Sequence, residues 1–136
     1  WVNNLFNNGS VVTNEGQDVD ISLDYVVFSN STSETGENCV IINSYGMSRS
    51  SCLRLNRFIC QYSSPCRNGN GILNLYNTIT VDSKCFVLFS SSIWTIYAAS
   101  FACTLRGWTL ADLDTANEFQ SVVAELKKPF YMYHPD

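Results

Sequence analysis

The chain has 136 residues, the usual size of a single domain, and carries a formal net charge of -4. Only 15% of its residues are charged while 13% are aromatic, which favours a packed, β-rich core and argues against disorder. The eight lysines and arginines are scattered and form no basic face, so neither nucleic acid nor an anionic membrane is an expected partner.

The cysteines and glycosylation motifs indicate an oxidising compartment. Six cysteines, an even number without any CxxC pair, occur at Cys39, Cys52, Cys60, Cys66, Cys85 and Cys103. His134 is the only histidine, so three disulfides are favoured over a structural zinc site. Sequons for N-glycosylation begin at Asn8 and Asn30. With no apolar run of membrane-spanning length, we expect an extracellular, secreted glycoprotein without membrane insertion, either mature or excised from a longer chain.

Residues 1–62 are predicted to form strands joined by loops. Their short apolar runs alternate with clusters of Asn, Ser, Gly and Thr, and lie at residues 11–12, 25–28 and 39–42. A polar stretch over residues 63–71, with one proline and two glycines, is predicted to be a connector. Further strand-like runs follow on either side of a polar turn at residues 82–84, at residues 72–76 and 85–89.

Two helices are predicted after these strands. The first covers residues 92–103, where apolar side chains at helical spacing form one stripe, namely Trp94, Ala98, Phe101 and Ala102. The second begins near Thr115, whose hydroxyl is placed to cap the helix while Glu118 reaches back, and it ends at Pro129. Its apolar face consists of Ala116, Phe119, Val122, Val123 and Leu126. Both stripes are interpreted as core packing, without a cofactor role.

Several landmarks in the second half of the chain follow the pattern of a known family. They are Lys84-Cys85-Phe86, then Trp94, Ala98 and Cys103, then residues 105–113 and Glu118. These residues resemble the KCY, WxxAxxxC, GGxLAxI and helix-two patterns in the N-terminal half of a C-type lectin-like domain. The strand that follows in that family has a WIGL pattern, which Trp1 to Leu5 resembles.

The C-terminal half of the same family pattern continues from residue 1. Gly16 and residues 25–28 resemble its glycine turn and YxxW stretch, while residues 37–40, Cys52 and residues 57–60 resemble its CV...C and FICE ending. The resemblance therefore implies the equivalent of one domain, with its two halves in permuted order along the chain. Its parts are a C-terminal half (1–62), a connector with the start of the long-form hairpin (63–71) and an N-terminal half (72–136). The implied fold is α+β, with two helices on twisted antiparallel sheets and a long irregular loop region.

The resemblance also implies how the six cysteines pair. It selects Cys60 with Cys103, Cys39 with Cys52, and Cys66 with Cys85, out of fifteen possible arrangements.

The permuted order has two explanations, a truly permuted gene or a stretch cut from a tandem array or from two neighbouring domains. The second is favoured because Asp136 runs into Trp1 without a gap in the family pattern. Head-to-tail assembly into a filament is an associated hypothesis.

The calcium ligands of the family have no counterpart in this sequence. Where the family has EPN or QPD, residues 29–37 lack a proline, and the WND positions read Met47-Ser48-Arg49. An arginine in place of a carboxylate disfavours a calcium ion, which needs six to eight oxygen ligands. A glycan on Asn30 would occupy the same surface. Glu34 and Glu37 in this loop are interpreted as solvated carboxylates, so we expect no metal and no cofactor.

No residue set predicts catalysis, and we expect no enzyme. His134 has no partner nucleophile in the sequence, and Asp18, Asp20 and Asp24 are interpreted as an outward face. The aromatic run Phe130, Tyr131, Met132 and Tyr133 is either a buried strand or a contact surface.

Two functions from different classes of binding module remain open. The first is a non-enzymatic recognition or structural module that acts through protein contacts or self-association, in a tandem or filamentous assembly. The alternative is a calcium-independent carbohydrate-binding lectin, which would stack sugars on Trp or Tyr.

Overall fold

Two long paired strands form the centre of the computed structural model, which describes residues 1–7, 10–12, 39–44, 46–66 and 77–128. Strand β5 (Asn56–Tyr62) runs antiparallel to β7 (Lys84–Trp94), with Cys60 opposite Val87. Strands β6 (Asn77–Val81) and β8 (Thr109–Leu110) complete a four-stranded sheet in the order β6-β7-β5-β8, called the central sheet below. Asp82 and Ser83 turn the chain from β6 to β7 with positive φ angles of 48° and 67°, where a polar turn was predicted.

A second antiparallel sheet is built from the first fifty residues, in the order β2-β1-β3-β4. Its strands are β1 (Val2–Asn7), β2 (Ser10–Val12), β3 (Cys39–Asn43) and β4 (Gly46–Ser50). The expected α+β class is therefore confirmed, with two helices and two sheets in the described part of the chain. The strands expected at residues 25–28 and 72–76, and most of the connector, lie outside the described residues.

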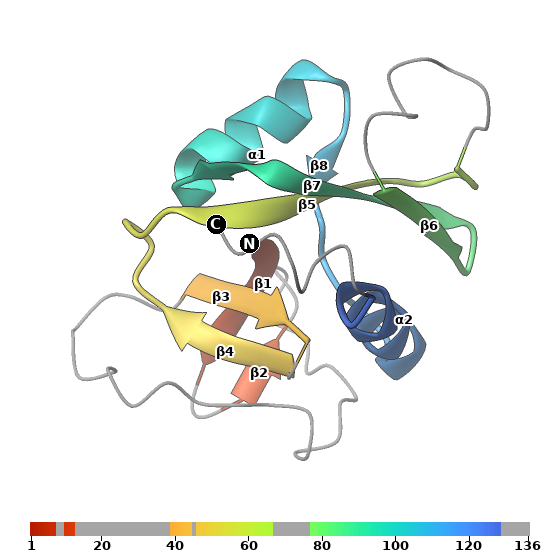
Figure 1. Cartoon of the computed structure of the whole chain (residues 1–136), viewed down its shortest axis with the longest axis horizontal. Helices are drawn as coiled ribbons and strands as arrows, with labels where there is room; N and C mark the ends of the chain where they lie inside the picture. Colours follow the sequence, from red (N-terminus) through yellow and green to blue (C-terminus); the bar gives the residue numbers. More distant parts are fainter. Residues whose placement is uncertain (8–9, 13–38, 45, 67–76, 129–136) are drawn as a thin grey trace.

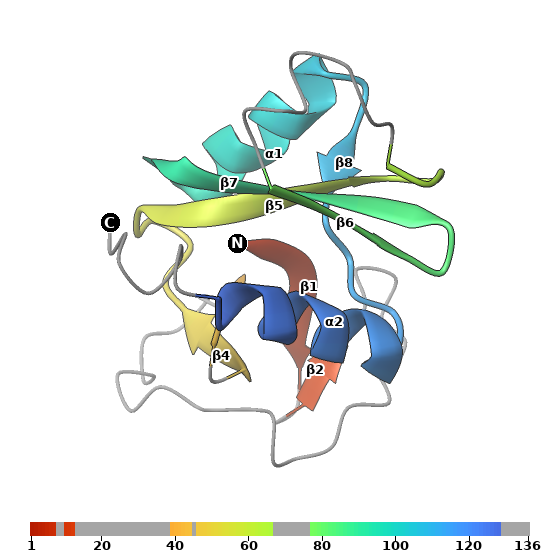
Figure 2. The same cartoon turned by 45° about the vertical axis from the view of Figure 1, so that its right-hand side comes forward.

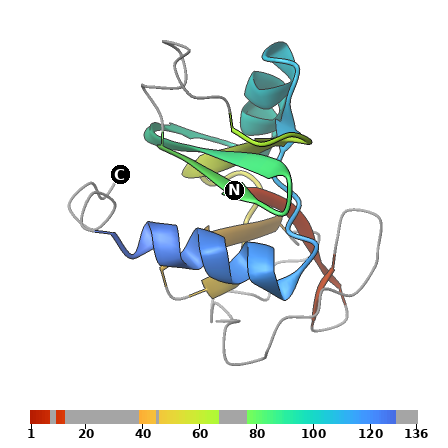
Figure 3. The same cartoon turned by 90° about the vertical axis from the view of Figure 1, so that its right-hand side faces the viewer.

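The elements stack on both faces of the central sheet. Helix α1 (Ile96–Leu105) covers one face, whereas α2 (Ala116–Leu126) and the second sheet lie on the other (Figures 1 and 3). Because side chains alternate along a strand, β5 and β7 supply a separate core to each face. Phe58 and Val87 join the core under α1, while Ile59 and Leu88 join the core under α2. The start of β1 enters between the central sheet and α2 (Figure 2).

Helix α2 begins at its predicted cap, and its glutamate reaches back as predicted, to the residue before the cap. The hydroxyl of Thr115 accepts a hydrogen bond from the backbone N–H of Glu118 at 3.1 Å. The buried carboxylate of Glu118 accepts from the N–H of Asp114 at 2.8 Å and forms an ion pair with Lys84 at 3.2 Å. Burial lowers the pKa of Lys84, but the hydrogen bonds and charges of Asp114 and Glu118 outweigh it, so the net shift is upward. As predicted, the apolar face of α2 packs on the core.

The prediction for α1 was wrong in its boundaries and in its buried face. The helix starts after the cap Thr95, and residues 92–94 belong to β7. Its buried residues are Ile96, Ala99 and Cys103. In contrast, Trp94 and Phe101, which were predicted to pack in the core, are 45% and 64% exposed. The physical reason is that apolar residues surround α1 on nearly all sides, so periodicity alone does not determine which side faces inward.

Residues 1–62 and residues 72–136 are joined within this one chain by the Cys60–Cys103 disulfide and by hydrogen bonds. The three disulfides are those implied by the resemblance, Cys39–Cys52, Cys60–Cys103 and Cys66–Cys85. The Asn3 N–H donates to the carbonyl of Ala111 at 2.6 Å. The fully buried Asn4 side chain donates to the Leu113 carbonyl and accepts from the Leu113 N–H, both at 2.9 Å. Asn4 thus holds β1 against a segment 109 residues away.

Replacing Asn4 with alanine is expected to lower the free energy of unfolding by about 2–3 kcal/mol, because both backbone groups of Leu113 lose a buried partner. Urea unfolding measures this change. The matched control is Asn117→Ala, since Asn117 is exposed and its side chain donates to Asp82 at 3.1 Å. That substitution is expected to cost less than about 0.5 kcal/mol. Equal effects of the two substitutions would contradict the role given to Asn4.

Candidate functional site

The outer side of α1 carries large apolar side chains that the protein leaves uncovered. Tyr97, Phe101 and Leu105 follow one another at intervals of four residues, so they form one stripe along the helix. Their exposed fractions are 65%, 64% and 69%. Trp94, at the end of β7 just before the helix, is 45% exposed. We call Trp94, Tyr97, Phe101 and Leu105 the α1 surface.

The composition of α1 explains why this surface exists. The helix contains no charged residue, and its polar residues are Ser100 and Thr104. The hydroxyl of Thr104 donates to the Ser100 carbonyl at 3.0 Å, so it is satisfied within the helix. The disulfide from Cys103 to Cys60 holds the side with the small residues against the central sheet. The side chains of Tyr97, Phe101 and Leu105 therefore point outward, the reverse of an ordinary surface helix.

A groove of about 250 Å³ lies beside these side chains. Its lining residues are Phe58, Phe89, Ser92, Trp94, Ala98, Phe101, Ala102, Leu105 and Arg106. The rings of Phe58 and Phe89 stack with centroids 4.6 Å apart, and both side chains are buried. The groove is therefore lined mainly by apolar and aromatic side chains, and Trp94, Phe101 and Leu105 of the α1 surface are among them.

Arg106 supplies the one charge among the residues that line this groove. Its guanidinium carbon lies 5.2 Å from the ring centroid of Phe89. One guanidinium nitrogen donates to the Ala102 carbonyl at 3.0 Å. Both contacts hold the charge at the C-terminal end of α1, where it also complements the helix dipole.

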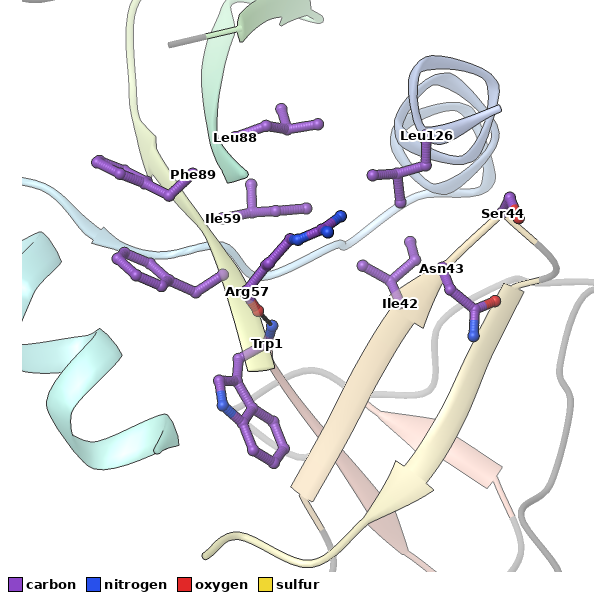
Figure 4. Close-up of a pocket in the computed structure, with 10 residues that line it drawn as sticks. Trp1, Ile42, Asn43, Ser44, Arg57, Ile59, Leu88, Phe89 and Leu126 are labelled. Carbon is purple, nitrogen blue, oxygen red and sulfur yellow. Dashed lines mark hydrogen bonds between the residues drawn. The ribbon is translucent and has the colours of Figure 1, made fainter. Parts of the chain in front are cut away.

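A second cavity, of about 180 Å³, lies on the other side of the central sheet (Figure 4). It is lined by Trp1, Ile42, Asn43, Ser44, Arg57, Phe58, Ile59, Leu88, Phe89 and Leu126. The amino group of Trp1 donates to the Arg57 carbonyl, and its burial lowers its pKa from 8.0 to about 5. The indole N–H of Trp1 donates to the Trp94 carbonyl at 2.8 Å. The Trp1 ring thus supports the backbone of Trp94 at the edge of the α1 surface.

The structure places few of the residues that sequence reasoning singled out for binding. Met47 is fully buried in β4, so this position points into the core. Among the described residues, no group of three or more His, Cys, Asp or Glu side chains is arranged to hold a metal ion. No described helix is long and apolar enough to cross a membrane. Several candidates lie outside the described residues, namely Asn8, Asp18, Asp20, Asp24, Asn30, Glu34, Glu37, Phe130, Tyr131, Met132, Tyr133 and His134.

Tyr97, Leu105 and Arg106 were not predicted to be surface residues. One signal was present, because residues 96–105 include no charged side chain and have three large apolar side chains at intervals of four. A helix that is apolar all round is normally buried all round. In this chain the helix leaves Tyr97, Phe101 and Leu105 exposed, so part of its apolar surface is uncovered.

Comparison of the chain with protein-family models, with curated proteins and with solved structures finds no match.

Proposed function

We propose that this chain is a non-enzymatic, extracellular recognition or structural module with a C-type lectin-like fold, which acts through protein–protein contacts. The observation that carries the proposal is the α1 surface with its apolar groove. Contiguous apolar patches of this kind on folded proteins are typical of interaction sites. Aromatic residues and arginine are also the types enriched where proteins meet.

An extracellular setting is supported by the covalent structure. All six cysteines are paired, and such disulfides persist in oxidising compartments. The sequons at Asn8 and Asn30 agree with secretion. A tandem or filamentous assembly completes the proposal, and the permuted order of the family landmarks along the chain supports it.

Residue types in the groove favour a protein partner over a sugar. Two of its nine lining residues, Ser92 and Arg106, have polar side chains, and Arg106 already donates to Ala102. A sugar carries many hydroxyl groups, and each one buried without a partner costs about 1–3 kcal/mol. An apolar protein side chain has no such cost. The alternative, a calcium-independent carbohydrate-binding lectin, draws its support from the half-exposed ring of Trp94, on which a sugar would stack.

A glycan array run with and without EDTA separates the two functions. We expect no glycan to bind under either condition, because the groove offers few polar partners for hydroxyl groups. Trp94→Ala serves as the specificity variant. Glycan binding that persists in EDTA and disappears in Trp94→Ala would overturn the protein-contact function in favour of the lectin.

A further inference from the structure

We propose that the partner of the α1 surface is a second copy of this chain, with the two α1 helices crossing antiparallel about a two-fold axis near Phe101. This inference rests on the proposed function, because it names the protein that the surface contacts. Three features of the described residues support it, namely the area of the surface, its charge and its shape.

The exposed area of the α1 surface is more than half of what one side of a stable interface buries. If a large side chain has about 200 Å² of accessible area, the exposed fractions of the four residues leave roughly 500 Å² of side chain uncovered. A standard interface buries about 800 Å² on each partner. The walls of the groove extend the surface towards that value.

The charge distribution permits the surface to meet its own copy. Because α1 has no charged residue, two such helices bring no like charges together along their contact. Arg106 lies five residues beyond Phe101, so an antiparallel crossing near Phe101 separates the Cα atoms of the two Arg106 residues by about 15 Å along the helix axes. Each guanidinium group is held on its own chain by its contacts with Ala102 and Phe89.

The shape of the surface is complementary to itself. Tyr97 and Leu105 flank Phe101 by four residues on either side, so the two-fold axis brings Tyr97 of one copy opposite Leu105 of the other. Ala98 and Ala102 line the groove beside these ridges, and small residues leave room for large ones from a facing helix. A two-fold interface requires this kind of self-complementary patch. A partner with a long acidic or basic surface would find only Arg106 among the residues that line the groove.

Charge substitutions at the axis test the inference. Phe101→Glu and Phe101→Lys each place two like charges face to face, so each variant alone is expected to weaken dimerisation at least about 100-fold. An equimolar mixture of the two variants is expected to restore a dimer containing one of each, because opposite charges then meet. Sedimentation equilibrium and light scattering measure the mass of the wild-type chain, of each variant and of the mixture.

Matched controls separate the interface from folding. Ala124→Glu and Ala124→Lys introduce the same charges on the exposed side of α2, across the central sheet from α1, and are expected to leave the dimer unchanged (Figure 1). Disulfide mapping of each Phe101 variant checks that Cys60–Cys103 still forms. This substitution is compatible with folding because Phe101 is 64% exposed.

The outcomes distinguish this inference from the function on which it rests. A dimer that both Phe101 variants abolish and that their mixture restores supports the inference. A wild-type chain that is monomeric up to its solubility limit overturns the second copy as partner, and so does a dimer that the Phe101 variants leave intact. The glycan array decides the proposed function separately, because sugar binding that persists in EDTA and is lost in Trp94→Ala would overturn it whatever the mass of the chain.

Discussion

Replacing Cys60 and Cys103 together with alanine is expected to lower the free energy of unfolding by about 4 kcal/mol, the largest loss from any of the three bridges. The bridge closes a loop of 43 residues, whereas the other two span 13 and 19 residues. On the entropic account, closing those shorter loops contributes about 3 kcal/mol each. Both sulfur atoms of the long bridge also belong to the buried core beneath α1, so their removal leaves a cavity there.

The comparison with the shorter bridges makes the experiment specific. Double alanine variants of Cys39 with Cys52, and of Cys66 with Cys85, are unfolded in guanidinium beside the variant of Cys60 and Cys103. Replacing both members of a pair avoids a free thiol that would exchange with the remaining bridges. We expect the variant of the long bridge to have the lowest midpoint. The prediction fails if either shorter bridge contributes as much stability.

A chain with a free amino group at Trp1 is expected to lose about 4 kcal/mol of stability between pH 8 and pH 5. The pKa of this amino group is about 5 in the folded protein and 8.0 when it is unburied. The unfolded chain therefore binds more protons over this range, and stability falls as the pH is lowered. Three pKa units correspond to about 4 kcal/mol. The effect of this group is absent above pH 8 and complete below pH 5.

Two controls identify the group that causes this pH dependence. Acetylation of the Trp1 amino group removes the charge, so the acetylated chain is expected to have a nearly flat stability profile between pH 5 and pH 8. His134→Gln in both forms removes the single histidine of the chain. Chemical unfolding at half-unit pH steps gives the profiles. Identical slopes for the free and acetylated chains would show that the amino group of Trp1 is not responsible.

Local patterns in the sequence were sufficient to predict several elements. The polar residues at 82–84 predicted the turn between β6 and β7, and the apolar run at 39–42 lies within β3. Thr115 was correctly predicted to cap α2, since its hydroxyl and the Glu118 N–H are close in the chain itself. These features depend on contacts between near neighbours. The disulfide pairs, in contrast, came from the resemblance to a family and not from spacing.

Features that depend on distant residues were not predicted. The inward side of α1 is fixed by the bridge from Cys103 to Cys60, 43 residues away, which no helical pattern contains. The carboxylate of Glu118 reaches back as expected, but its ion pair with Lys84, which lies 34 residues away in the sequence, was not predicted. The position of Arg106 over Phe89 likewise depends on the packing of α1 on β7. The candidate site could therefore be identified only from the folded structure, in which these segments lie side by side.

The narrow contact of α1 with the central sheet has a consequence for local unfolding. Ile96, Ala99 and Cys103 are its buried residues, and two of these three have small side chains, whereas α2 buries Phe119, Val122 and Val123. Less apolar area is therefore lost when α1 detaches than when α2 does, so α1 is expected to open at a lower free energy than the rest of the domain. The Cys60–Cys103 bond keeps a detached α1 tethered to β5. A second molecule bound to the outer side of α1 would raise the free energy of this opening, so association and the rigidity of the helix are thermodynamically linked.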